Sequence, residues 1–179
     1  MSELKDTVMS EEPQGIFVTL LSEARQNAEK AVELHKELAE MAGDHAQIKE
    51  LIEAHAFIAA KALEHLDLSF KLIGARPVVV KARLHHEVFV EELRKHLAEI
   101  KSPIARHIFF LAKLAHLNHI RIGEFEALLA ANVTGHQGVA TLLEAAKAAR
   151  VAAAERTRDL ARRIVEVKVL ERKLAAAGV

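Results

Sequence analysis

The chain has 179 residues, of which 51% are hydrophobic and 28% are charged, a composition typical of one folded domain rather than of a disordered chain or a membrane protein. Its 25 basic residues balance its 25 acidic residues, so no overall field favours nucleic acid or an acidic lipid surface. Cysteine, tryptophan and tyrosine are absent, which excludes disulfides, thiolate metal sites, thiol catalysis and tyrosyl chemistry.

Residues 1–15 are polar, include Pro13 and Gly15, and predict a flexible lead, followed by a single domain over 16–179. The lead is acidic and has no apolar run typical of a signal peptide. No window approaches the roughly 20 apolar residues that span a bilayer. We therefore expect a cytoplasmic protein that binds neither membranes nor nucleic acid.

Two apolar stripes with a period of about 3.6 residues predict a first pair of long helices, over 16–42 and 46–73. Gly43 separates them, and Gly74 with Pro77 ends the second. Because the turn between them is so short, the two helices are expected to be antiparallel neighbours.

The next segment predicts a lead-in and an extra, shorter helix, since a β-branched triplet at 78–80 gives way to a helical pattern that ends near Ile100. Ser102 and Pro103 form an N-cap and first-turn pair for a helix that runs to about Asn132. Because the connection between the second and third long helices is long, these two helices are expected to run parallel.

Residues 139–177 contain no glycine or proline and predict one helix of roughly 60 Å, at about 1.5 Å per residue. Its second half carries an apolar strip, which we expect to overhang the bundle and to pair with a second copy of the chain. The strip consists of Leu160, Ile164, Val167, Leu170 and Leu174. The four long helices together predict an all-α fold, a ferritin-like antiparallel four-helix bundle with a long crossover that contains the extra helix.

Polar side chains interrupt the apolar stripe of the helix over 103–132. The helical spacing of its apolar residues places Asn118 in the centre of the buried face and Arg121 one turn later. The guanidinium is expected either to reach the core or to extend past it to solvent. Any chemistry is therefore expected around these two side chains and their neighbours on facing helices.

Helix phase also places His35 and His55 on buried faces, and each is ten residues from His45 in the turn, so they are expected to meet at one height. Together with His119 or Asn118 they could hold a single Zn²⁺, Ni²⁺ or Fe²⁺ ion. The alternative is that each histidine is a core side chain with a hydrogen bond across helices.

A second group of histidines and acids precedes the third long helix, where His85 and His86 stand beside Glu87, Glu91 and Glu92. It lacks the second ligand of an H-x-x-x-H motif, because the residue four positions after His86 is a valine. We expect this group to lie on the surface.

Three segments resemble the YciF-type ferritin-like family of bacterial stress-associated proteins. They read LIEAHAFIAAKALEHLDLSFKLIGA, SPIARHIFFLAKLAHLNHIRIGEFEALLAAN and ATLLEAAKAARVAAAE. In the family, the third helix carries the pattern E-H-Y-E-I-A followed by an aromatic residue, and its two glutamates are implied metal ligands. Here Asn118 and Arg121 stand in place of those glutamates, whereas His119 and Phe125 are kept.

The other helices show the same loss of acids. His55 matches the family histidine, but Ile58 replaces the glutamate that follows it. On the first helix, matching by letters keeps Glu29, whereas matching on the buried stripe puts Ala31 in the ligand position. We prefer Ala31, because it and Ile58 are then equidistant from the turn. On the last helix, the glutamate pair of the family falls near Arg150.

The resemblance therefore implies the family fold without its di-iron centre, and no cofactor is expected. Arg121, with Arg150, is expected to replace the charge of the lost metal. An alternative is that Asn118 and Arg121 form a buried polar pair that only fixes the register of the helices.

No Ser-His-Asp order, glycine-rich phosphate loop or acid–base pair is visible, so we do not expect an enzyme. The sequence favours a non-catalytic bundle that acts through self-association, as a homodimer, or through a partner protein, in a stress-related role that the resemblance implies. Two alternatives remain open. One is a residual histidine-rich metal protein for storage, sensing or weak oxidase activity, and the other is a binder of an apolar or tetrapyrrole ligand with a histidine as axial ligand.

Overall fold

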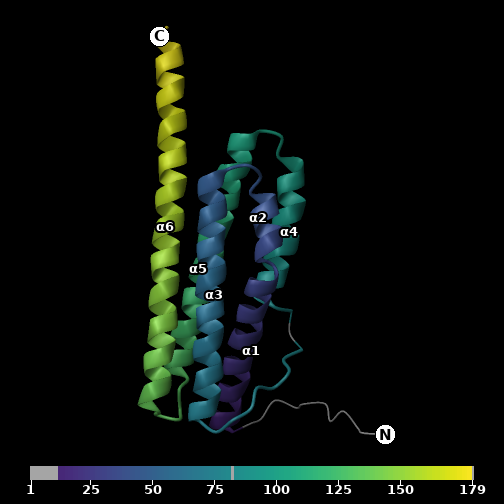
Figure 1. Cartoon of the computed structure of the whole chain (residues 1–179), viewed down its shortest axis with the longest axis vertical. Helices are drawn as coiled ribbons and strands as arrows, with labels where there is room; N and C mark the ends of the chain where they lie inside the picture. The colour runs from purple at the N-terminus through teal and green to yellow at the C-terminus, as the bar shows by residue number, and fades with distance from the viewer. Residues whose placement is uncertain (1–11, 82, 179) are drawn as a thin grey trace, which may run out of the picture.

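The structure is a computed structural model, and it describes residues 12–81 and 83–178. Within these residues the fold is all-helical and contains no strand. Four long helices lie side by side, and two short helices complete the upper half of the bundle (Figure 1). The helices are α1 (Pro13–Glu33), α2 (His35–Met41), α3 (Ala46–Leu72), α4 (His85–Glu99), α5 (Pro103–Ala130) and α6 (Gln137–Ala176).

The directions of the helices follow the ferritin-like arrangement. In Figure 1, α1 and α6 rise from the lower end, whereas α3 and α5 descend. The parallel pair α3 and α5 is joined by a crossover that returns from the lower to the upper end and contains α4. The start of the crossover is tied to α1, because the Val78 backbone N–H donates a 3.0 Å hydrogen bond to the Ser22 hydroxyl. The predicted ferritin-like bundle with an extra helix in its crossover is confirmed.

The first predicted helix, over 16–42, is two helices in the structure. α1 begins at Pro13, because proline in the first turn lacks only an N–H that would have no partner in the helix. The chain then bends at Leu34 (φ −91°, ψ 1°), where His35 Nδ1 lies 2.6 Å from the Val32 carbonyl oxygen. A side chain that binds a backbone carbonyl at this point competes with the helical ladder, which gives a local reason for the break.

The other predicted boundaries follow from local signals, and those of α3, α5 and α6 fall within two residues of the observed ones. The Ser102 hydroxyl caps α5 as predicted, accepting a 3.4 Å hydrogen bond from the Ala105 N–H. Gly43 and Gly74 both have φ of 64°, a conformation that ends a helix and that other residues rarely adopt. Of the predicted lead over 1–15, residues 1–11 lie outside the described residues, and residues 13–15 are already helical.

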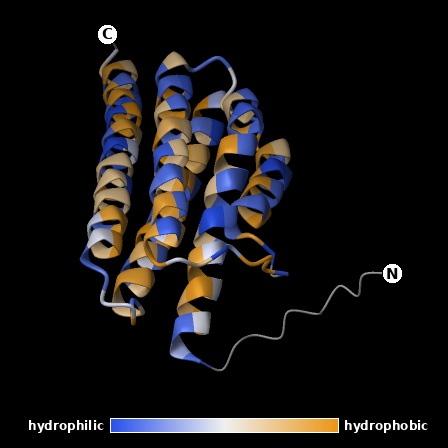
Figure 2. Ribbon diagram, turned by 60° about the horizontal axis from the view of Figure 1, so that its bottom comes forward, coloured by the Kyte–Doolittle hydropathy of each residue, from blue (hydrophilic) through white to orange (hydrophobic). Residues whose placement is uncertain are grey.

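Buried apolar side chains form two clusters, one in each half of the bundle. The upper cluster includes Leu38, Leu114 and Leu160, and the lower one includes Phe17, Phe125 and Leu143. Between the clusters lies a set of buried polar side chains that we call the polar layer, formed by Asn27, His55, His86, Asn118, Arg121, Arg150 and Thr157. In Figure 2 the helices carry both hydrophobic and hydrophilic residues, as their amphipathic patterns predict. Across 12–81 and 83–178, no helix has the combination of length and apolarity needed to cross a bilayer.

Candidate functional site

Hydrogen bonds through Asn118 join three helices at the centre of the polar layer. The Asn118 amide nitrogen on α5 lies 2.9 Å from His55 Nε2 on α3 and donates to the Thr157 hydroxyl on α6 at 3.3 Å. Thr157 donates its own proton to the Ala153 carbonyl at 2.8 Å. Because His55 Nδ1 lies 2.7 Å from the Leu51 carbonyl, the hydrogen-bond network assigns the proton to Nδ1 and leaves Nε2 to accept from Asn118. His55 is thus a neutral core histidine bonded across helices, which was one of the predicted alternatives.

Arg121 reaches the core, which decides between the two predicted positions of its guanidinium. Its side chain is 1% exposed, and Nη1 lies 2.5 Å from Oε2 of Glu124, one turn later on α5. Asn27 of α1 donates a 3.1 Å hydrogen bond to the other oxygen of Glu124. This carboxylate, itself only 14% exposed, therefore links the Arg121 charge to α1.

Arg150 enters the same layer from α6 and is 4% exposed. Its Nε and Nη2 atoms have no hydrogen-bond partner within the described residues. Burial lowers the pKa of Arg150 to about 9, with the Arg121 charge acting in the same direction and Glu124 against it. The guanidinium consequently keeps its charge at pH 7, although no carboxylate of the described residues is in contact with it.

His86 is a member of the polar layer that the sequence analysis placed on the surface. It is buried on α4, and its Nε2 has no hydrogen-bond partner within the described part of the chain. The signal that would have revealed it is its spacing from Val90, Leu93 and Leu97, which form the buried side of α4. Desolvation lowers the pKa of His86 to about 3 and that of His55 to about 4, so both imidazoles are neutral at pH 7.

A small cavity of about 20 Å³, measured as the space open to the centre of a water molecule, lies within this layer. It is lined by polar residues from five helices, namely His35, His55, His86, Arg121 and Arg150, and by Ala31, Leu38, Ile52, Ala56, Leu114 and Leu117. His35 and His55 do meet at one level, as predicted. Ala31 lines the cavity, as its helical phase predicts, whereas Glu29 is exposed and paired with Arg25; that Ala31 holds the ligand position of the family stays a prediction.

His119 does not join this cavity. It lies on the exposed side of α5, because it follows the buried Asn118 by about 100° of helical rotation. The prediction that His35, His55 and His119 form one metal site is therefore wrong in its placement of His119. No cluster of three or more His, Cys, Asp or Glu side chains suited to a metal ion occurs in residues 12–81 and 83–178.

The cavity wall also does not fit the carboxylate-bridged metal pair that the resemblance implies. The residues at the expected ligand positions are Ala31, Asn118 and Arg121, with Ile58 only half-buried. Glu124 is a carboxylate beside the cavity, and its charge is already engaged by Arg121. Two fixed guanidinium charges would repel a pair of metal cations, so we derive no metal chemistry from this site. The cavity volume is likewise suited to a water-sized group and not to a tetrapyrrole.

One protein-family model matches most of the chain. The family model described as a domain of unknown function, DUF892, matches residues 12–170. The chain belongs to the DUF892 family. No curated protein matches the chain significantly.

Solved structures with the same fold support this assignment. The stress protein YciF from E. coli matches with a TM-score of 0.80 at 18% identity, covering 88% of this chain and 99% of YciF. YcfI from Rhodopseudomonas palustris, described as a candidate structural protein, matches with a TM-score of 0.76 at 16% identity, covering 88% of this chain and 98% of its own. A protein from Xanthomonas campestris matches with a TM-score of 0.67 at 20% identity, covering 91% of this chain and 99% of its own. The YciF-type resemblance seen in the sequence is confirmed, and at these identities the structures establish the fold.

The end of α6 is the second unusual feature of this DUF892 protein. Figure 1 shows that α6 rises past the other helices. We call its large exposed side chains the apolar end of α6, which consists of Val165, Val167, Val169, Leu170 and Leu174. Leu160 and Ile164 of the predicted strip pack instead on the upper cluster, so the expectation that the whole strip overhangs is wrong for these two residues.

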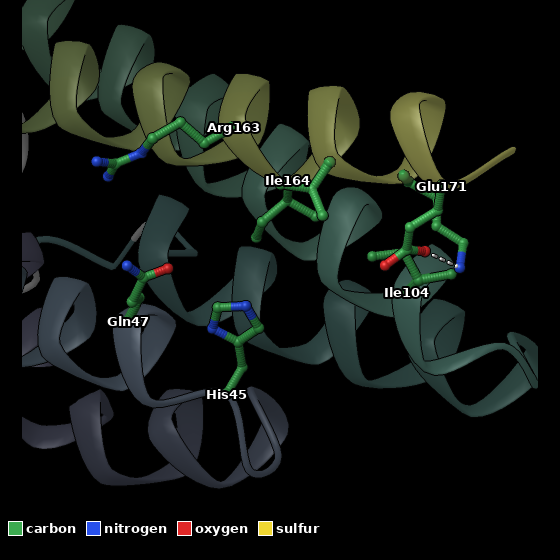
Figure 3. A pocket seen from close by; sticks show the side chains of 8 residues that line it. His45, Gln47, Ile104, Arg163, Ile164 and Glu171 are labelled. Atoms are coloured by element: carbon green, nitrogen blue, oxygen red, sulfur yellow. Dashed lines mark hydrogen bonds and ion pairs between the residues drawn. The ribbon is translucent and has the colours of Figure 1, made fainter. Parts of the chain in front are cut away.

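A groove of about 430 Å³ opens where α6 leaves the bundle. It is lined by His45, Gln47, Ile104, Arg163, Ile164, Val167, Lys168 and Glu171. Figure 3 shows Ile164 extending from α6 toward His45, with Arg163 at one end and with Ile104 and Glu171 at the other. The groove thus combines apolar side chains with Arg163 at one end and the ion pair of Lys168 and Glu171 at the other.

Proposed function

We propose that this DUF892 protein is a non-catalytic structural protein that acts by forming a homodimer through the apolar end of α6. The observation that carries the proposal is the exposure of Val167 and Leu170, at 58% and 57%, on a helix that extends past the bundle. Val167, Leu170 and Leu174 share one face of the helix, and a contiguous exposed apolar strip of this kind is typical of an interaction surface. The naming of YciF as a stress protein, and the candidate structural role of YcfI, favour such a function during stress.

The sequence of α6 favours an antiparallel pair with a two-fold axis at Val167. In that arrangement each Val167 meets its own copy, and Ile164 of one subunit lies opposite Leu170 of the other. Arg163 then lies opposite Glu171, so that Glu171, which already pairs with Lys168 of its own helix, would gain a second cationic partner across the axis. Leu170 of one copy would enter the groove beside Ile164 and Val167 of the other.

The composition of the polar layer supports the absence of catalysis. Its charged groups are two guanidiniums, and the carboxylate beside it, Glu124, is already paired with Arg121. Its buried histidines, His55 and His86, are kept neutral at pH 7 by desolvation. The hydroxyl of Thr157 donates to a backbone carbonyl and is not activated by a base.

A single-cysteine variant tests the proposed dimer, because the chain contains no cysteine of its own. We expect Val167→Cys to form a covalent dimer on mild oxidation, since the two-fold axis brings the two sulfur atoms together. The matched control is Val133→Cys, at an exposed site in the α5–α6 turn at the opposite end of the bundle. Equal crosslinking of both variants, or a wild-type mass of 19.8 kDa by light scattering at micromolar concentration, would contradict the proposal.

A further inference from the structure

Two guanidinium groups share one small buried space, and the protein supplies only part of the charge that they require. Arg121 and Arg150 both line the cavity of the polar layer. Arg121 has an ion pair with Glu124, whereas no ion pair of Arg150 is present within residues 12–81 and 83–178. Because a buried charge without a counter-charge is strongly unfavourable, a further negative group is expected next to Arg150.

The remaining groups around the cavity do not provide that charge. His35 is an imidazole whose Nδ1 contacts the Val32 carbonyl, and His55 and His86 are neutral at pH 7. Glu23 of α1 lies with Glu124 along a surface groove and acts on Arg121, but it does not influence Arg150. Within the described residues Arg150 therefore has no carboxylate in ion-pair contact, and the carboxylate that acts on it, Glu124, is already paired with Arg121.

The size and chemistry of the cavity restrict what can occupy it. The space open to the centre of a water-sized group is about 20 Å³, so the cavity has room for a small group but not for a large organic ligand. The buried polar atoms without a hydrogen-bond partner include guanidinium donors on the two arginines, namely Nε and Nη2 of Arg150 and Nε, Nη1 and Nη2 of Arg121, together with the acceptors Oδ1 of Asn118 and Oε2 of Glu124. A spherical acceptor with a negative charge satisfies several donors at once, whereas a water molecule would leave the charge unbalanced.

We propose that the cavity between Arg121 and Arg150 binds one monovalent anion of the size of chloride in the middle of the bundle. The anion accepts hydrogen bonds from both guanidiniums and is shielded by apolar walls that include Leu114 and Leu117. Its negative charge gives Arg150 a counter-charge in direct contact, as Glu124 does for Arg121. This site is independent of the proposed dimer, since it lies between the two apolar clusters and away from the end of α6.

Thermal unfolding at constant ionic strength tests the site, with sodium gluconate replaced stepwise by sodium chloride. Because a ligand that binds only the folded state stabilises it, we expect the wild-type Tm to rise by roughly 3–5 °C for each tenfold increase of chloride above its Kd. Arg150→Met should remove this response. Arg158→Met, at an exposed position of the same helix, should keep it.

Crystals soaked in sodium bromide provide a second readout that does not depend on the variants. We expect one anomalous bromide peak in contact with both guanidinium groups. A cavity that contains only water, or a Tm response to chloride that Arg150→Met leaves unchanged, would overturn the proposal. A wild-type protein that is monomeric but still responds to chloride would contradict the proposed homodimer and leave the anion site supported.

Discussion

In the middle of the bundle, two guanidiniums and two histidines are shielded from water, whereas at the end of α6 five large apolar side chains are exposed to it. Arg150 and Val167 illustrate the contrast, because both lie on the same continuous helix. Arg150 is buried because α6 packs there on α3 and α5 between two apolar clusters. Val167 is exposed because α6 has by then passed the ends of its neighbours. On this helix the surroundings of a residue, and not its own polarity, decide its burial.

The largest effect is expected from removing the carboxylate that pairs with Arg121. Glu124→Gln should reduce the free energy of unfolding by about 3–5 kcal/mol, because breaking a buried ion pair leaves a charge without its partner. Urea unfolding measures the loss. The control is Glu126→Gln, an exposed site on the same helix that should stay within about 0.5 kcal/mol of the wild type. If both variants lose equally little free energy of unfolding, Arg121 has another counter-charge.

A charge at the apolar end of α6 should act on association and leave folding intact. Val167→Asp places two carboxylates together at the proposed two-fold axis, so we expect the Kd of the dimer to rise roughly 100-fold, or about 2.7 kcal/mol. Sedimentation equilibrium measures the change. Val133→Asp, exposed at the other end of the bundle, should not alter the Kd. An unchanged Kd for Val167→Asp would show that the dimer interface lies elsewhere on the protein.

The histidines of the polar layer should make stability depend on pH. His86 binds a proton near pH 6.5 when unfolded but only near pH 3 when folded, so the unfolded state takes up the proton first as the pH falls. The stability that this histidine contributes is complete above pH 6.5 and is lost progressively below it. From pH 6.5 to pH 5 the loss is about 2 kcal/mol, since one pKa unit corresponds to about 1.4 kcal/mol. Chemical unfolding at several pH values should show a shallower dependence for His86→Leu, and an equal slope in both proteins would contradict the burial of His86.

The smallest effect is expected from removing the arginine that has no carboxylate in contact. In chloride-free buffer, Arg150→Met should raise the free energy of unfolding by about 1 kcal/mol, because an apolar side chain of similar length replaces a buried charge. Arg158→Met serves as the exposed control and should be neutral. A destabilisation of Arg150→Met in that buffer would show that the protein itself satisfies this guanidinium. The measurement is equilibrium unfolding in urea.

Much of the fold, and part of the polar layer, could be predicted from the sequence. Ser102 and Pro103 marked the start of α5, and the spacing of apolar residues placed Asn118 and Arg121 inside the bundle. Those signals are local, because a cap or a helical face involves residues within a few turns of one another. The break at Leu34 was not predicted, since it coincides with a contact between the His35 ring and a neighbouring carbonyl that leaves no trace in the apolar pattern.

The sequence by itself determined the helices, their order and the presence of polar groups on buried faces, because helical periodicity is a property of neighbouring residues. Only the tertiary structure decided which of those groups meet. It brought His86 of the crossover helix to Arg121 and Arg150, and it turned His119 to the outside. It also divided the apolar strip of α6 into a packed part and an exposed part. The physical reason is that contacts between helices depend on where each helix ends and which neighbour faces it, and the packing of the whole chain sets both.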